Sequence, residues 1–203
     1  AIELEDVAGR FEADVAGRLG LAASVTFSDL TPRMALFVSK EGHCLWDILS
    51  RYESGEWNVQ IPLIISNHPR FAAVAEQFAI PYHELPVTKD TKPQVERRQV
   101  ELLREHDVDF AVLARYMQIL TDSFLEAFAR PTINIHHSFL PAFAGARPYH
   151  QAHERGVKII GATAHYVTAD LDAVAIIEQQ TTRVSHSDSV AEMMRRGKDL
   201  EKL

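Results

Sequence analysis

The stretch that decides the fold is residues 132–149, TINIHHSFLPAFAGARPY, which begins as an apolar strand and ends in a loop broken by proline and glycine. Asn134 and His136 are two residues apart on the strand part. Because side chains alternate across a strand, both point to one side, and Ile133 and Ile135 point to the other. An amide and an imidazole side by side at the end of a buried strand suit the polarisation of a small carbonyl group.

On either side of this stretch, strand patterns alternate with helix patterns. Apolar runs predict strands at residues 34–38, 61–65, 110–114, 133–136, 159–167 and 175–184. Amphipathic or capped segments predict helices at 43–53, 71–78, 92–106, 124–128 and 147–155. Repeated strand–helix–strand units predict an α/β fold, namely a Rossmann-like, mostly parallel sheet with helices on both faces. Ligands of such sheets lie beyond the carboxyl ends of the strands, so the turns after Val38, Ile65, Ala114 and Ile135 are expected to line one cleft there.

The N-terminal part is predicted to be separate from this sheet. Residues 2–19 carry apolar side chains at helical spacing, and residues 21–32 have a mixed composition that is typical of a connector. We therefore expect an N-terminal helix and connector at 1–32, followed by one catalytic domain at 33–203.

Composition excludes several classes of function. The formal net charge of −7 argues against nucleic acid as a partner, because phosphate binding needs a basic surface. No apolar run approaches the roughly 18 residues that a membrane span needs, so no membrane association is expected. The single cysteine, Cys44, cannot form an internal disulfide, which favours a reducing cytoplasm.

Other reactive residues have simpler explanations. Five histidines fall between positions 136 and 165, but no paired cysteines or His-Glu-x-x-His string accompany them, so no metal is expected. Ser138 lacks the Gly-x-Ser-x-Gly surroundings of a serine nucleophile. The turn at 38–44, VSKEGHC, lacks the glycine pattern of a nucleotide loop, and Cys44 is expected to be a packed helix residue.

Two aspartates follow the strand predicted at 159–167. Asp170 or Asp172, placed near Asn134 and His136, would accept a proton from water and favour the charged form of the imidazole. The residues alone do not choose between them.

Six segments closely resemble the formyltetrahydrofolate deformylase family. They are VSKEGHCL at 38–45, ISNHP at 65–69, LARYMQIL at 113–120, NIHHSFLPAF at 134–143, GARPYHQA at 145–152 and RGVKIIGATAHYVT at 155–168. The resemblance implies a formyltransferase fold. It also implies hydrolysis of 10-formyltetrahydrofolate to formate and tetrahydrofolate, in support of one-carbon and purine metabolism. The folate is then a substrate, no cofactor is bound tightly, and the protein is a homo-oligomer.

The same resemblance implies site residues. The wider superfamily uses an Asn, a His two residues later and a subsequent Asp, which fall on Asn134, His136 and Asp172. Two loops are then expected to hold the pterin of the folate. Their residues are Arg115, Met117, Gln118, Ile119 and Leu120 in the first loop, and Val167, Thr168 and Leu171 in the second.

Two alternatives remain at this point. Glycinamide ribonucleotide formyltransferase shares the Asn-His-Asp trio, but its first turn is rich in glycine and unlike the KEGHC at 40–44. A catalytically impaired folate-binding relative is the second alternative. It arises because the family has Glu-Gly-Pro after the aspartate, where this chain has Ala-Val-Ala at 173–175.

The resemblance also bears on the ends of the chain. Family members carry an N-terminal ACT-type regulatory domain, so residues 1–32 are expected to be the junction to such a domain. They also continue beyond the segment that matches GKDLE at 197–201. The catalytic domain is therefore expected to lack its C-terminal end.

Overall fold

The computed structural model describes residues 4–23, 25, 27, 30–142, 147–168 and 175–202. The chain divides into two compact units, Ala1–Thr31 and Pro32–Leu203. The first unit contains α1 (Leu4–Phe11), a π-helical turn η1 (Glu12–Ala16) and α2 (Gly17–Leu19). The last of these helical segments ends at Gly20, which has a positive φ of 64°. The helix that the sequence predicts over 2–19 is thus present as three consecutive helical segments.

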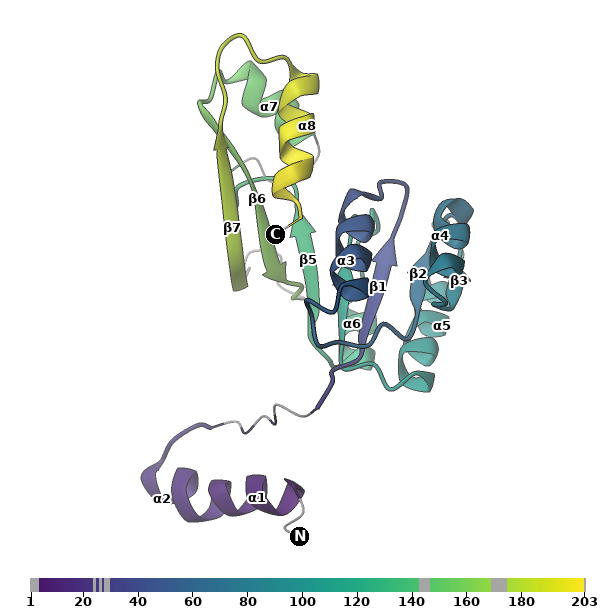
Figure 1. The fold of residues 1–203 in the computed structure, drawn as a ribbon, viewed down its shortest axis with the longest axis vertical. Coiled ribbons are helices and arrows are strands. Elements are labelled where there is room, and N and C mark those ends of the chain that lie inside the picture. The colour runs from purple at the N-terminus through teal and green to yellow at the C-terminus, as the bar shows by residue number, and fades with distance from the viewer. Residues whose placement is uncertain are drawn as a thin grey trace. The chain divides into compact units, whose positions relative to one another are not determined.

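The second unit is built on one seven-stranded sheet in the order β3-β2-β1-β4-β5-β6-β7 (Figure 1). Strands β3, β2, β1, β4 and β5 pair in parallel, whereas β6 pairs antiparallel with both β5 and β7. The predicted mostly parallel sheet is therefore confirmed. The strands are β1 (Met34–Val38), β2 (Ile64–Ser66), β3 (Tyr82–Glu84), β4 (Phe110–Leu113), β5 (Thr132–His136), β6 (Ile159–Tyr166) and β7 (Ala175–Arg183).

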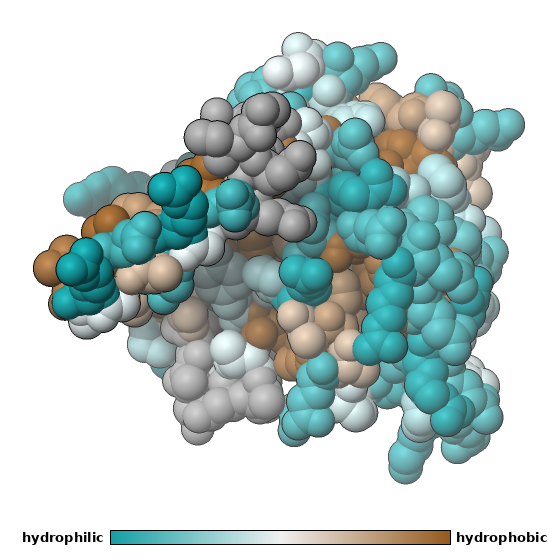
Figure 2. Space-filling view, turned by 90° about the horizontal axis from the view of Figure 1, so that it is seen from below, coloured by the Kyte–Doolittle hydropathy of each residue, from teal (hydrophilic) through white to brown (hydrophobic). Residues whose placement is uncertain are grey.

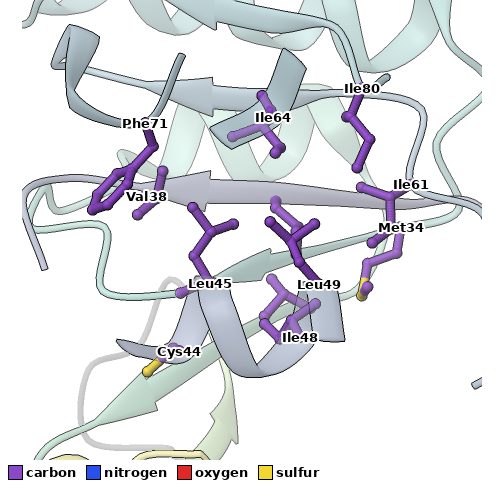
Figure 3. Close-up of a cluster of buried hydrophobic side chains, with 14 residues drawn as sticks. Met34, Val38, Cys44, Leu45, Ile48, Leu49, Ile61, Ile64, Phe71 and Ile80 are labelled. Atoms are coloured by element: carbon purple, nitrogen blue, oxygen red, sulfur yellow. The ribbon is translucent and has the colours of Figure 1, made fainter. Parts of the chain in front are cut away.

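Helices cover both faces of the parallel part of the sheet. They are α3 (His43–Glu53), α4 (Ala72–Gln77) after the short 3₁₀ turn η2 (Pro69–Phe71), α5 (Lys92–Glu105) and α6 (Asp122–Phe128). Strand β1 is buried on both sides, and alternate residues divide between two cores. Leu36 and Val38 pack with α3 and α4, while Ala35 and Phe37 pack with α5 and α6. Figure 3 shows Leu45 and Leu49 projecting from α3 toward β1.

A third, smaller core lies over the antiparallel part. It joins α7 (Pro148–Glu154) and α8 (Val190–Leu200) to β6 and the end of β7. Ser189 caps α8 with a full capping box, because its side chain accepts from the backbone N–H of Glu192 and the Glu192 side chain accepts from the Ser189 N–H. Leu200, the last residue of α8, packs against this core.

Most elements agree with those predicted from the sequence, and three do not. The strand predicted at 61–65 pairs only at Ile64–Ser66, although Ile61 and Leu63 are buried. Strand β3 is short and polar and has no strand pattern of its own. Helix α8 was not predicted, although its capping box is a recognisable signal. Thr121 caps α6, since its side chain accepts from Phe124 N.

Most of the face drawn in Figure 2 belongs to hydrophilic residues. Within the described part of the chain, no helix has the length and apolar character that a membrane crossing needs.

Candidate active site

Loops from separate strands are joined at the carboxyl edge of the sheet. Ser39, which follows β1 and is buried, donates from Oγ to Asn67 Oδ1 over 2.7 Å. The same oxygen accepts from the backbone N–H of Met117 over 2.9 Å. Asn67 follows β2 and Met117 follows β4, so three strand-end loops meet through one hydroxyl group, at the edge where the sequence predicts a site.

Asn134, in the middle of β5, is held by a neighbouring histidine. It lies opposite His165 in the antiparallel ladder, and its Nδ2 donates to His165 Nε2 over 3.2 Å. The other ring nitrogen of His165, Nδ1, contacts the carbonyl oxygen of Tyr166 at 3.0 Å, which fixes the proton on Nδ1. An amide nitrogen carries two N–H bonds, so Asn134 has a second one for another acceptor.

His136, the last residue of β5, lies in a cluster of rings. Its ring centroid is 5.4 Å from that of His137 and 6.3 Å from that of His165. Burial lowers the pKa of His136, and the charges of His165 and Arg115 lower it further, while Glu201 acts in the opposite direction. These surroundings favour the neutral ring, which still donates one hydrogen bond. Its buried Nε2 has no hydrogen-bond partner among the described residues.

The loop after His136 is fixed by a buried hydroxyl group. Thr163 Oγ1 on β6 donates to the carbonyl of Ser138 over 2.9 Å and accepts from Leu140 N over 3.1 Å. Gln179 on β7 donates from Nε2 to Thr163 Oγ1 over 3.0 Å and to Leu140 O over 2.9 Å. Gly161 allows this close approach, since a Cβ there would lie 2.5 Å from the carbonyl oxygen of Gln180.

A second polar group, which we name the Glu201 cluster, lies beside these histidines and consists of His43, Arg115, Tyr149 and Glu201. Glu201 Oε2 accepts from His43 Nε2 over 2.7 Å and lies 3.4 Å from Arg115 Nε. Tyr149 OH donates to Glu201 Oε1 over 2.9 Å. Four segments that are distant in the sequence thus converge on one carboxylate.

Cys44 lies next to this cluster. It is buried, and its thiol donates to the carbonyl oxygen of Glu201 over 3.2 Å. Burial, helped by the charge of Glu201, raises the pKa of Cys44 to about 12, so the thiol stays protonated. Potential ligand atoms of His43, Cys44 and Glu201 lie within 4.8 Å of one another. The nearby Arg115 cation opposes a metal ion, and we interpret the group as hydrogen-bonded side chains.

The two sets of residues predicted to contact the folate lie at opposite edges of the sheet. Residues 115–120 follow β4 at the carboxyl edge, whereas Val167 and Thr168 follow the antiparallel β6, beside the start of β5. Met117 and Ile119 are 56% and 76% exposed, whereas Leu120 is buried and Gln118 is half-buried. The backbone of Val167, just after β6, donates to Thr132 O over 2.8 Å.

Not all predicted residues can be placed. Thr168 is exposed at the end of the described part of this second loop. Asp170, Leu171 and Asp172 lie outside the described residues. The structure thus brings Asn134 and His136 together, and the third member of the trio stays a prediction.

The sequence profile described as formyl transferase matches residues 32–203, and the chain belongs to this family. Within the family, a formyltetrahydrofolate deformylase from Synechocystis sp. is 56% identical over 189 residues, which are 93% of this chain and 66% of that protein. The chain therefore spans just under two thirds of that relative.

Solved structures point to the same group. A formyltetrahydrofolate deformylase from Pseudomonas syringae pv. tomato matches with a TM-score of 0.93 and 45% identity, over 98% of this chain and 67% of that one. A phosphoribosylglycinamide formyltransferase from Bacillus halodurans matches less well, with a TM-score of 0.78 and 30% identity, over 84% of this chain and 89% of that one. The fold is common to both activities, and the greater similarity is to the deformylase.

Proposed function

We propose that the protein hydrolyses 10-formyltetrahydrofolate to formate and tetrahydrofolate, in support of one-carbon and purine metabolism, and that residues 33–203 carry this activity. The observation that carries the proposal is the pair of Asn134 and His136 at the carboxyl end of β5. The pair lies in a chain whose relatives at 56% and 45% identity are formyltetrahydrofolate deformylases.

Asn134 and His136 would stabilise the oxygen of the formyl group. The second N–H of Asn134 and one N–H of His136 would donate to this oxygen as it becomes negative during attack by water. His165 supports the role of Asn134, because it accepts the first N–H and so orients the amide. A neutral imidazole serves this purpose, and a carboxylate from Asp172 close to the ring would raise the pKa of His136 again.

Asp172 would complete the reaction. Its carboxylate takes a proton from the attacking water, and the oxygen of that water bonds to the formyl carbon. The bond from this carbon to the folate nitrogen then breaks, and Asp172 passes the proton that it took from water to the nitrogen. The product leaves as formic acid, which loses its remaining proton to solvent and becomes formate. Asp172→Asn should reduce formate release by about 100-fold or more, whereas Asp170→Asn, two residues away, should not. The reverse ranking would assign the base to Asp170.

The loop after β4 would hold the pterin. Met117 and Ile119 offer exposed apolar side chains for a flat ring, and Leu120 anchors the loop in the core beside α5 and α6. Lys92 Nζ donates to the carbonyl oxygen of Ile119, which ties the loop to the start of α5. Arg115, Gln118, Val167, Thr168 and Leu171 are the other residues that we propose to contact the folate.

The acceptor of the formyl group distinguishes this function from transfer to glycinamide ribonucleotide. The purified protein is incubated with 10-formyltetrahydrofolate, with and without glycinamide ribonucleotide, and both formate and tetrahydrofolate are measured. Formate release without the amine supports hydrolysis. Turnover that depends strictly on the amine would replace the proposal with a transferase, and folate binding without turnover would indicate an impaired relative.

The proposal also includes the cellular compartment and the oligomeric state of the enzyme. One cysteine in 203 residues supports a reducing compartment such as the cytoplasm. The family resemblance supports a homo-oligomer, which light scattering of the purified protein would check.

A further inference from the structure

Glu201, in the turn after α8, is a buried charge held by two hydrogen-bond donors and one ion-pair partner from three other elements. Glu201 is 2% exposed. It is contacted by His43 at the start of α3, Tyr149 of α7 and Arg115 after β4. Burial by itself would raise the pKa of Glu201, but the hydrogen bond from His43 and the charge of Arg115 outweigh it and lower the pKa. A buried carboxylate is costly unless it is paired in this way, so the carboxylate and its partners form one interdependent unit.

The Glu201 cluster reaches the catalytic histidine through a series of rings. The Tyr149 ring centroid lies 6.1 Å from that of His137, and the His137 ring lies 5.4 Å from that of His136. Figure 1 shows the C-terminal end of the chain beside the end of β5. A displacement of Tyr149 would therefore also displace His137 and His136 at the end of β5.

Helix α8 is shaped to let Tyr149 reach Glu201. Gly197 lies one helical turn before Glu201, and a Cβ at this position would lie 1.9 Å from the Tyr149 hydroxyl oxygen. Only a residue without a side chain permits this contact. Glycine is less favourable than alanine inside a helix, so its presence here is best explained by the tyrosine.

The other side of the cluster holds Arg115 in an uncommon backbone conformation. Arg115 has a φ of 63°, which non-glycine residues rarely adopt. Its carbonyl oxygen accepts from Ser39 N over 3.2 Å, and its guanidinium Nε lies 3.4 Å from Glu201. The cluster thus fixes the first residue of the loop that we propose to hold the folate.

We propose that Glu201 is a positioning residue for the formyl site, holding Arg115 on one side and Tyr149 and His43 on the other, so that the loops after β4 and β5 keep their geometry around His136. This inference rests on the proposed hydrolase function. Glu201 does not touch the reacting atoms in this account, and it acts through its partners.

The test compares Glu201→Gln with Asp199→Asn. Asp199 is a matched control because it lies two residues earlier, near the end of α8, is exposed and contacts Lys202. Displacing reactive groups by about 1 Å can cost 100-fold in rate, so we expect Glu201→Gln to lower kcat by about tenfold or more per folded molecule. Asp199→Asn is expected to keep kcat within about twofold.

A second readout does not depend on activity. The described groups that face His136 are His165 from β6, Arg115 after β4, Glu201 after α8 and its neighbour His137. Because Glu201 raises the pKa of His136, Glu201→Gln should move the NMR titration of this ring to lower pH, and Asp199→Asn should not. Assignment uses the signal lost in His136→Gln.

The outcomes separate the two proposals. An unchanged His136 titration in folded Glu201→Gln, with kcat per folded molecule also unchanged, would reduce Glu201 to a structural residue and overturn the inference. If the unsubstituted protein releases no formate, the hydrolase proposal fails, and the titration still decides the role of Glu201. If Glu201→Gln does not fold, Gly197→Ala displaces Tyr149 instead, and an unchanged kcat in that variant overturns the inference.

Discussion

Thr163→Val tests how the loop after His136 is held. Thr163 is fully buried, and valine has nearly the same shape, so the substitution removes a hydroxyl group without opening a cavity. It leaves Leu140 N and Ser138 O without their present partner, while Gln179 keeps its bond to Leu140 O. An unsatisfied buried group costs about 1–3 kcal/mol, so we expect the two groups together to lower the free energy of unfolding by about 3 kcal/mol.

The control for this prediction is Thr163→Ser. Serine keeps the hydroxyl group and loses one methyl group, which costs about 1 kcal/mol. Urea unfolding at pH 7 measures both variants, and kcat for formate release should fall more in the valine variant because the loop adjoins His136. If the valine variant is as stable as the serine variant, Thr163 Oγ1 does not hold the loop and the reasoning is refuted.

Three further predictions concern stability, each measured as the free energy of unfolding. Burial, followed by the charge of Arg115, lowers the pKa of His137 from 6.5 to about 4. Below pH 6.5 the unfolded chain therefore binds a proton that the folded chain does not, and about 3 kcal/mol should be lost between pH 6.5 and 4. His137→Phe should flatten that part of the pH profile, and an unchanged profile would contradict it. Ser189→Ala should cost about 1 kcal/mol by removing the cap of α8, whereas Ser187→Ala should cost less. Gly161→Ala should cost about 1–3 kcal/mol, because the new methyl group meets the backbone of Gln180, and a neutral result would mean that the strands move apart freely.

The parts of the fold with strong local patterns could be predicted from the sequence. Strand β1 is a continuous apolar run, and α5 has a clear apolar face, so both were placed within about a residue. Strand β3 could not be recognised, because Tyr82 and Glu84 give no apolar alternation and only pairing with β2 makes them a strand. Helix α8 carries a capping box but a mixed composition, and its signal was overlooked.

The residues of the candidate site likewise include some that could be predicted from the sequence and some that could not. Asn134 and His136 could be found because strand alternation and a long motif place them together. The Glu201 cluster could not, because residues 43, 115, 149 and 201 are brought together only by the folded chain. The neutral state that burial favours for His136 was also missed, since the sequence does not report the burial of a residue at a strand end.

The most direct test of the central claim is the rate of formate release by His136→Ala, measured with 10-formyltetrahydrofolate and no amine acceptor. Loss of one donor to a developing oxyanion typically slows such a reaction by about 100- to 1000-fold, and a loss of this size is expected here with the fold retained. A folded His136→Ala protein that releases formate within a few-fold of the unsubstituted rate would contradict the assignment of the site to the end of β5.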